Sequence, residues 1–144
     1  MSRCVIFSLT VAILILSTAP FAPLSADMAD KVVGVWLRPQ NGSHIKFYKC
    51  GGSLCGKVAK VTDPSRKDVN NPDPKLRTRP VVGVLIMNGA KKTNANSWEG
   101  KLYSTDSGKT FNGTVTILDE SSLQLRGCVF ARILCRNENW SRVK

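Results

Sequence analysis

Polar and apolar residues alternate with a period of two over most of the chain, which is typical of β-strands with one buried face. Ile45 and Phe47 alternate with polar neighbours, and Phe111 and Val115 do the same in a threonine-rich segment. Continuous apolar runs at residues 32–37 and 81–87 predict strands that are buried on both faces. No helical period extends over a useful length.

Turn signals separate these segments. Asn41-Gly42 and Asp106-Ser107-Gly108 predict tight turns, residues 51–54 predict a hairpin turn, and Asn88-Gly89 predicts the start of another turn. We expect about eight strands with short connections, apart from one long link. Eight antiparallel strands in meander order close into an all-β barrel, which removes its edges and leaves an interior for one small ligand.

The long link is residues 63–80, a largely polar segment without a strand or helix pattern. Links of this length are usually functional or disordered. Two interpretations stay open, a solvated crossover and a loop that shapes the mouth of the barrel. The candidate ligand-binding residues on this loop are Asp68, Asn70, Asn71, Asp73, Arg77 and Arg79.

The loop carboxylates Asp68 and Asp73 are candidates for acid/base chemistry or, with Asn70, for calcium binding. Their spacing lacks the glycine and glutamate of an EF-hand loop, and Asn-Asn-Pro-Asp-Pro is typical of turns. We therefore predict no metal and no cofactor. The sequence of residues 51–57 matches the G-x4-G-K pattern of a phosphate-binding loop. However, Val58 stands where that loop requires Ser or Thr, and a strand follows instead of a helix, so a hairpin turn is favoured.

Nucleophilic catalysis has little support, because no G-x-S-x-G motif occurs and His44 is isolated on a predicted strand. The sequence therefore favours a protein without catalytic activity, and an enzyme stays open as an alternative.

Residues 1–26 have the features of a secretory signal peptide, with Arg3, an apolar run at residues 5–16 and the small pair Ser25-Ala26. Cleavage after Ala26 leaves residues 27–144, which we expect to form a single β-barrel domain in the periplasm or outside the cell. No segment after residue 26 approaches the ~18 continuous apolar residues of a spanning helix.

The formal net charge is +11, and it falls to +10 when Arg3 is removed with the signal. This charge favours an anionic envelope component as a partner, although basic residues scattered for solubility would give the same total. Export and the scattered charge argue against nucleic acid.

Cys50, Cys55, Cys128 and Cys135 remain after cleavage, and an even number in an exported chain predicts disulfides. Their spacings do not fit the usual zinc pairs. A long-range bridge would constrain the unfolded chain more, by roughly 4.6 against 2 kcal/mol. Hairpin geometry instead favours Cys50–Cys55 and Cys128–Cys135, and three connectivities are possible.

Several motifs together resemble a known family: Gly34-Val35-Trp36, the segment 50–56, Asp68-Val69-Asn70-Asn71-Pro72-Asp73, residues 76–80, Gly127-Cys128, Leu134-Cys135-Arg136 and Trp140-Ser141-Arg142. On these motifs the chain resembles the exported bacterial domain-of-unknown-function family 2147. The resemblance implies a lipocalin-like (calycin-like) barrel, periplasmic or secreted, without an established reaction. Tyr103-Ser104-Thr105-Asp106 departs from the usual turn of that family.

A wider resemblance to lipocalins rests on Gly34-x-Trp36 and on a late arginine, Arg142. An arginine over an indole would close one barrel end, so Gly34, Trp36, Trp140 and Arg142 are predicted to be structural. The leading hypothesis is therefore an exported barrel that binds a small or amphipathic ligand. The alternative is a basic interaction module that docks on an acidic envelope component or partner protein, and an enzyme that uses the loop carboxylates is the third.

The export assignment makes a direct prediction. Protein purified from its own host should begin at Asp27, because the small residues before it fit signal cleavage. Intact-mass measurement tests this, and a mature protein that retains residues 1–26 would contradict it.

Overall fold

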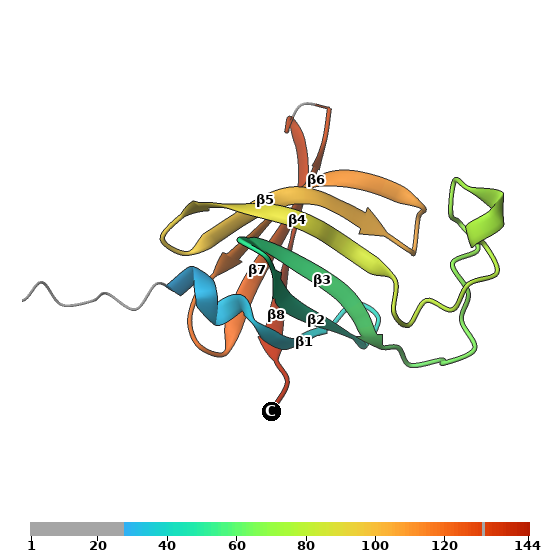
Figure 1. Cartoon of the computed structure of the whole chain (residues 1–144), viewed down its shortest axis with the longest axis horizontal. Coiled ribbons are helices and arrows are strands. Elements are labelled where there is room, and N and C mark those ends of the chain that lie inside the picture. The colour runs from blue at the N-terminus through green and yellow to red at the C-terminus, as the bar shows by residue number, and fades with distance from the viewer. Residues whose placement is uncertain (1–27, 131) are drawn as a thin grey trace, which may run out of the picture.

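The computed structural model describes residues 28–130 and 132–144, so the predicted signal peptide lies outside the described residues. Within them, eight antiparallel strands close into a barrel in meander order, as predicted (Figure 1). The strands are β1 Gly34–Arg38, β2 Ser43–Cys50, β3 Ser53–Lys60, β4 Leu85–Asn94, β5 Ser97–Ser104, β6 Lys109–Ile117, β7 Ser122–Val129 and β8 Leu134–Arg142.

Alternating burial explains why these segments are strands. In β2, Ile45 and Phe47 are buried while Lys46 between them is exposed. β6 runs unbroken through Asn112 and Gly113. The period-two pattern therefore predicts both the strands and their inward faces.

One end of the barrel is closed by a short 3₁₀ helix, η1 (Met28–Val32). It lies beside the β4–β5 and β6–β7 connections, opposite the long loop (Figure 1). Two carbonyl oxygens of η1 accept hydrogen bonds from indole N–H groups. Trp36 Nε1 donates to Val32 O at 2.8 Å, and Trp98 Nε1 donates to Ala29 O at 2.7 Å. The rings of Phe47 and Trp140 stack deeper in the barrel, with centroids 6.2 Å apart.

Arg142 completes this closure. Its guanidinium lies 4.2 Å from the centroid of the Trp36 ring. It also donates to three carbonyls, Glu120 O at 2.6 Å, Val33 O at 3.1 Å and Lys31 O. Gly34 has φ +140°, and a Cβ there would overlap the guanidinium, so glycine is required beside Arg142.

The disulfides are Cys50–Cys55 and Cys128–Cys135, as hairpin geometry predicted. Cys128 and Cys135 are directly opposed in β7 and β8. Cys50 and Cys55 are not, because β2 and β3 are joined by a two-residue turn and Cys50 is opposite Ser53. This bridge therefore runs diagonally across its hairpin, with a Cα separation of 5.8 Å.

The apolar run at residues 81–87 is not one buried strand. Residues 81–84 form a turn in which Val84 N donates to Val81 O, and β4 begins only at Leu85. Val82 and Leu85 are exposed, so the run was apolar without being buried throughout. The similar run at residues 32–37 is divided between η1 and β1.

Asn88-Gly89 was also misinterpreted, because it lies inside β4 and does not begin a turn. The pairing of β4 with both neighbours shifts register here, and Gly89 has φ +72°. The glycine therefore allows a bulge, where left-handed backbone is common.

Residues 28–130 and 132–144 contain no helix that is long and apolar enough to cross a membrane.

The contacts of Arg142 at the closed end predict that replacing its side chain by alanine destabilises the protein. Arg142→Ala removes the cation–π contact and three hydrogen bonds, so the free energy of unfolding should fall by about 2 kcal/mol. Urea unfolding followed by tryptophan fluorescence measures this. Arg136→Ala, which removes an exposed arginine of the same strand, should change stability by less than about 0.5 kcal/mol. Equal stability of the two variants would contradict the account.

Candidate functional site

The end of the barrel opposite η1 contains a cavity of about 950 Å³. Its wall is apolar and comes from most of the strands, because each contributes inward-facing residues near this end. The apolar lining includes Ile45, Val58, Val81, Ile86, Leu102, Phe111, Leu125, Val129, Phe130, Leu134 and Trp140. The bulky core residues Trp36, Trp98 and Phe47 fill the closed end instead, so the barrel is packed at one end and hollow at the other.

Three charged residues that line the cavity mouth, Arg38, Asp106 and Glu138, are connected to one another and to Arg66 of the long loop. We call these four residues the mouth network. Arg38 forms a bidentate pair with Glu138, with both N–O distances 2.8 Å. Its remaining nitrogen donates to Asp106 at 2.6 Å, and Arg66 pairs with the other oxygen of Asp106. The network thus joins β1, β8, the β5–β6 turn and the long loop.

The mouth network keeps its carboxylates ionised. Burial alone would raise the pKa of Glu138, but hydrogen bonds from Arg38 and from Trp140 Nε1 at 3.1 Å outweigh it, so this pKa lies below its usual value. The pKa of Asp106 is lowered in the same way by Arg66 and Arg38, against the effect of burial. The pKa of Arg38 is raised, chiefly by its hydrogen bond to Glu138.

Lys109 and Arg136 also line the cavity mouth. Neither has an ion-pair partner among the described residues, in contrast to Arg38 and Arg66. Their charges are therefore available to a negatively charged group at the mouth.

The long loop contains a second cluster, centred on Asp68, whose side chain is 0% exposed. Its Oδ1 accepts from the Tyr103 hydroxyl at 2.6 Å. Its Oδ2 accepts from Asn71 at 2.8 Å and from Arg79 Nε and Nη2 at 3.0 and 2.8 Å. The loop is thereby fixed to β5 at Tyr103, which itself lines the cavity.

These contacts set the charge state of the cluster. Burial opposes ionisation of Asp68, but the hydrogen bonds from Tyr103, Asn71 and Arg79 outweigh it and lower its pKa. Burial and the bond to Asp68 raise the pKa of Tyr103 to about 12. The carboxylate is thus already saturated with donors. Across the described part of the chain, no three His, Cys, Asp or Glu side chains come together to hold a metal ion.

The other predicted loop residues are placed as follows. Asn70 donates to the backbone carbonyl of Asp106 at 2.8 Å, and Arg77 donates to that of Asn71 at 2.8 Å. Asp73 caps the short 3₁₀ helix η2 (Pro74–Leu76) by accepting from Lys75 N at 3.0 Å. These side chains, like Asp68, Asn71 and Arg79, do not line the cavity. Of these residues, Asp68 and Asn71 contact Tyr103 and Asn70 contacts Asp106, and both Tyr103 and Asp106 line the cavity. A direct contact of the loop residues with a ligand stays a prediction.

A family model described as "Uncharacterized protein conserved in bacteria (DUF2147)" matches residues 34–142, which span nearly the whole described barrel. The chain belongs to this family. The match confirms the resemblance seen in the motifs. No curated protein matches the DUF2147 chain.

Among solved structures, this DUF2147 chain is similar to protein HP1028 from the human pathogen Helicobacter pylori, which is described as belonging to the lipocalin family. The sequences are 24% identical, the TM-score is 0.69, and the match covers 78% of this chain and 83% of that one. The similarity supports the lipocalin-like barrel.

Sequence reasoning missed Arg38 and Glu138, although a signal for both was present. Arg38 lies two residues after the buried Trp36, and Glu138 lies two residues before the buried Trp140. Residues two apart in a strand share a face, so both charges had to point inward. Tyr103 and Asp106 had no such signal, because their partners lie more than 30 residues away in the sequence, on the long loop and, for Arg38, on β1.

The Asp68 cluster predicts a pH-dependent loss of stability in Asp68→Asn. The substitution leaves Arg79 without its anion, so the free energy of unfolding at neutral pH should fall by about 2–3 kcal/mol. Because the folded pKa of Asp68 lies below its unfolded value, the ionised form stabilises the protein above that value, ~3.9. This contribution disappears as the pH falls through the folded pKa, so the two proteins should converge in acid.

Denaturant titrations over a pH series measure this difference. Asp73→Asn changes an exposed carboxylate of the same loop and should cost less than about 1 kcal/mol. A gap between wild type and Asp68→Asn that is independent of pH would contradict the assignment.

Proposed function

We propose that this protein is an exported, non-catalytic barrel that binds a small amphipathic ligand in the cavity. The observation that carries the proposal is the uneven filling of the barrel, packed around Trp36 at one end and hollow for about 950 Å³ at the other. Ligand pockets are concave, mostly apolar and supplied with a few polar groups, and this cavity has all three properties. The lipocalin-family description of the H. pylori neighbour agrees with such a role.

The lining favours an amphipathic anion. An apolar portion would lie along Phe111, Leu125 and Trp140, where burial removes it from water. A negatively charged end would lie at the mouth beside Lys109 and Arg136, which lack ion-pair partners within the described residues. Arg38 is less available, because Glu138 and Asp106 already neutralise it.

A role without catalysis is proposed because the candidate acids are committed to structural contacts. Asp68 accepts hydrogen bonds from Tyr103, Asn71 and Arg79, and Asp73 caps η2. A general acid or base must be able to reach the substrate, and these carboxylates do not line the cavity.

The proposed location is the periplasm or the extracellular space. The disulfides Cys50–Cys55 and Cys128–Cys135 support it, because such bonds persist in oxidising compartments.

Filling the cavity tests the proposed function. Leu125→Trp adds an indole at a buried cavity position, so binding of the fluorescent amphipathic anion anilinonaphthalene sulfonate should weaken about tenfold or more. Fluorescence titration of the wild type should show one saturable site, displaced by a long-chain fatty acid.

Leu85→Trp is the matched control, since it adds the same ring at an exposed position of β4. Its affinity should equal that of the wild type. The proposal would be contradicted if the wild type showed no saturable binding of anilinonaphthalene sulfonate, or if a folded Leu125→Trp variant bound it as tightly as the wild type. Circular dichroism of each variant separates lost binding from lost folding.

A further inference from the structure

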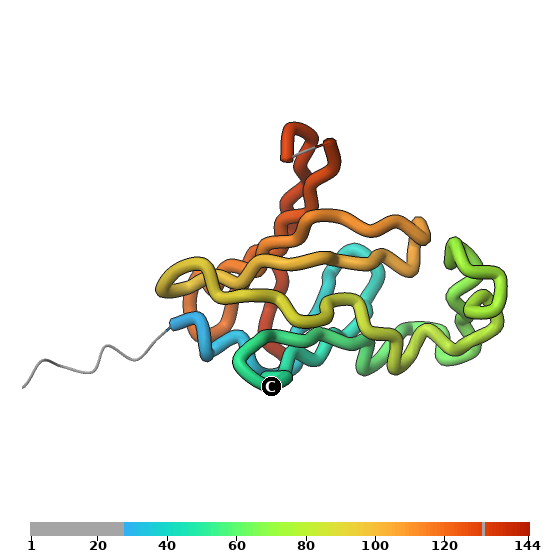
Figure 2. The backbone as a smooth tube through the Cα atoms, turned by 45° about the horizontal axis from the view of Figure 1, so that its top comes forward, coloured from blue at the N-terminus to red at the C-terminus, as the bar shows by residue number. Residues whose placement is uncertain are grey.

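The β7–β8 hairpin extends beyond the rest of the barrel. Pairing of β6 with β7 ends at Asn112–Cys128, and pairing of β1 with β8 ends at Leu37–Ser141. Pairing between β7 and β8 themselves continues to Val129–Leu134. The outer part of the hairpin is therefore a two-stranded ribbon, and it stands away from the barrel in both views (Figures 1 and 2).

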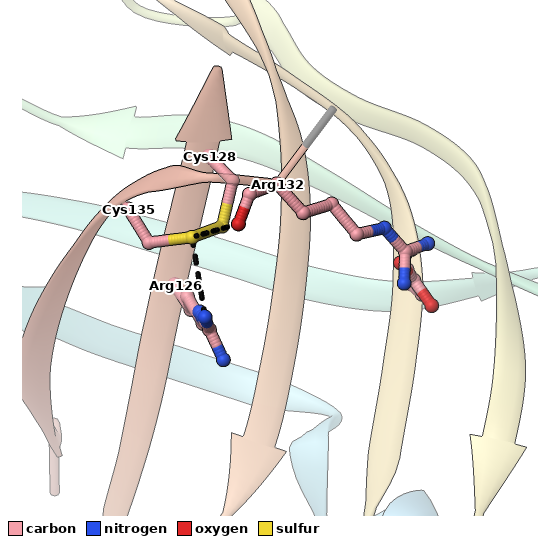
Figure 3. Close-up of a disulfide and its surroundings, with 5 residues drawn as sticks. Arg126, Cys128, Arg132 and Cys135 are labelled. Atoms are coloured by element: carbon pink, nitrogen blue, oxygen red, sulfur yellow. Dashed lines mark hydrogen bonds and ion pairs between the residues drawn. A yellow bond between two sulfur atoms is a disulfide. The ribbon is translucent and has the colours of Figure 1, made fainter. Parts of the chain in front are cut away.

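The end of this ribbon carries an apolar tip, consisting of Phe130, Ile133 and Leu134. Their exposed fractions are 77%, 86% and 63%. Single exposed apolar residues are ordinary, but a group of large ones on a projecting element marks an interaction site. The Cys128–Cys135 disulfide joins the two strands just behind the tip, at the last residue of β7 that pairs with β6 (Figure 3).

The charged residues at the end of the hairpin itself are all basic. Residues 126–136 contain Arg126, Arg132 and Arg136 but no acidic residue. Arg126 is directed at the disulfide and donates to Cys135 Sγ at 3.2 Å, whereas Arg132 extends away from it (Figure 3) and pairs with Glu99 on β5. Arg136 has no ion-pair partner in residues 28–130 and 132–144. Exposed apolar side chains framed by arginines match the interface of a bilayer that contains anionic lipids.

We propose that the apolar tip and its flanking arginines dock this protein on an anionic lipid surface. A bilayer is favoured over an acidic protein because the tip is small and convex. A specific protein partner normally needs about 800 Å² on each side and a complementary surface, whereas a bilayer accepts any projecting apolar group.

Docking has a consequence for the cavity, because Phe130, Leu134 and Arg136 also line its mouth. A tip inserted at the interface brings the cavity mouth to the lipid headgroups, so an amphipathic ligand can pass between membrane and lumen. This consequence rests on the proposed function, whereas docking itself does not.

The test is co-sedimentation of the disulfide-bonded mature protein with vesicles. Wild type should bind vesicles containing phosphatidylglycerol, bind pure phosphatidylcholine at least about tenfold more weakly, and release in high salt. The triple variant Phe130→Ser/Ile133→Ser/Leu134→Ser should lose about tenfold or more in affinity. Arg132→Gln/Arg136→Gln should reduce binding and its dependence on salt.

The matched control is Val69→Ser/Leu76→Ser/Val82→Ser, which removes exposed apolar residues of the loop region and should bind as wild type. Failure of wild type to bind phosphatidylglycerol vesicles, or equal binding by wild type and a folded tip variant, would overturn the proposal. An equal loss in the control would also overturn it, since the surface would then not be confined to the tip. Leu125→Trp should retain vesicle binding, which separates failure of docking from failure of the proposed function.

Discussion

The structure depends on how the barrel closes, at the junction of β1 and β8. Strand pairing there covers Trp36–Arg142 and Leu37–Ser141, and Val143 N donates to Val35 O at 2.9 Å beside them. At the closed end, Arg142 covers the Trp36 ring and binds the carbonyls of the connecting segments. At the other end, the bidentate pair between Arg38 and Glu138 takes the place of backbone hydrogen bonds. The junction of β1 and β8 is therefore held by Arg142 at the closed end of the barrel and by the Arg38–Glu138 ion pair at the end that contains the cavity.

The two ends differ in the physical cost of their contacts. Burial of Trp36, Phe47 and Trp98 at the closed end stabilises the fold through apolar area and satisfied indole donors. An ion pair in a low-dielectric site gains little net stability, because desolvation offsets the attraction. We infer that the mouth network matters mainly for the geometry and polarity of the cavity mouth. It joins the long loop to the barrel at Asp106, as Asp68 does at Tyr103.

Local patterning explains how much of this could be predicted. Burial alternates along β2, β6 and β7, so a period of two identified these strands. Each disulfide joins neighbouring strands, so hairpin spacing identified its partner. The prediction of strands buried on both faces at residues 32–37 and 81–87 was wrong, because apolar content does not reveal whether a segment pairs with another strand. The role of Asp68 as a brace for Tyr103 also required three-dimensional information, since 35 residues separate them. The exposed tip at Phe130 lacked a signal, because an apolar residue beside a strand looks like a buried one.

The central claim is that the open end of the barrel is a binding site for an amphipathic molecule. Native mass spectrometry of the protein purified from its own host tests it most directly. The account predicts a complex heavier than the disulfide-bonded polypeptide, which releases one small anionic amphiphile when the protein is denatured. A native spectrum that shows only the mass of the polypeptide with its disulfides would contradict the account.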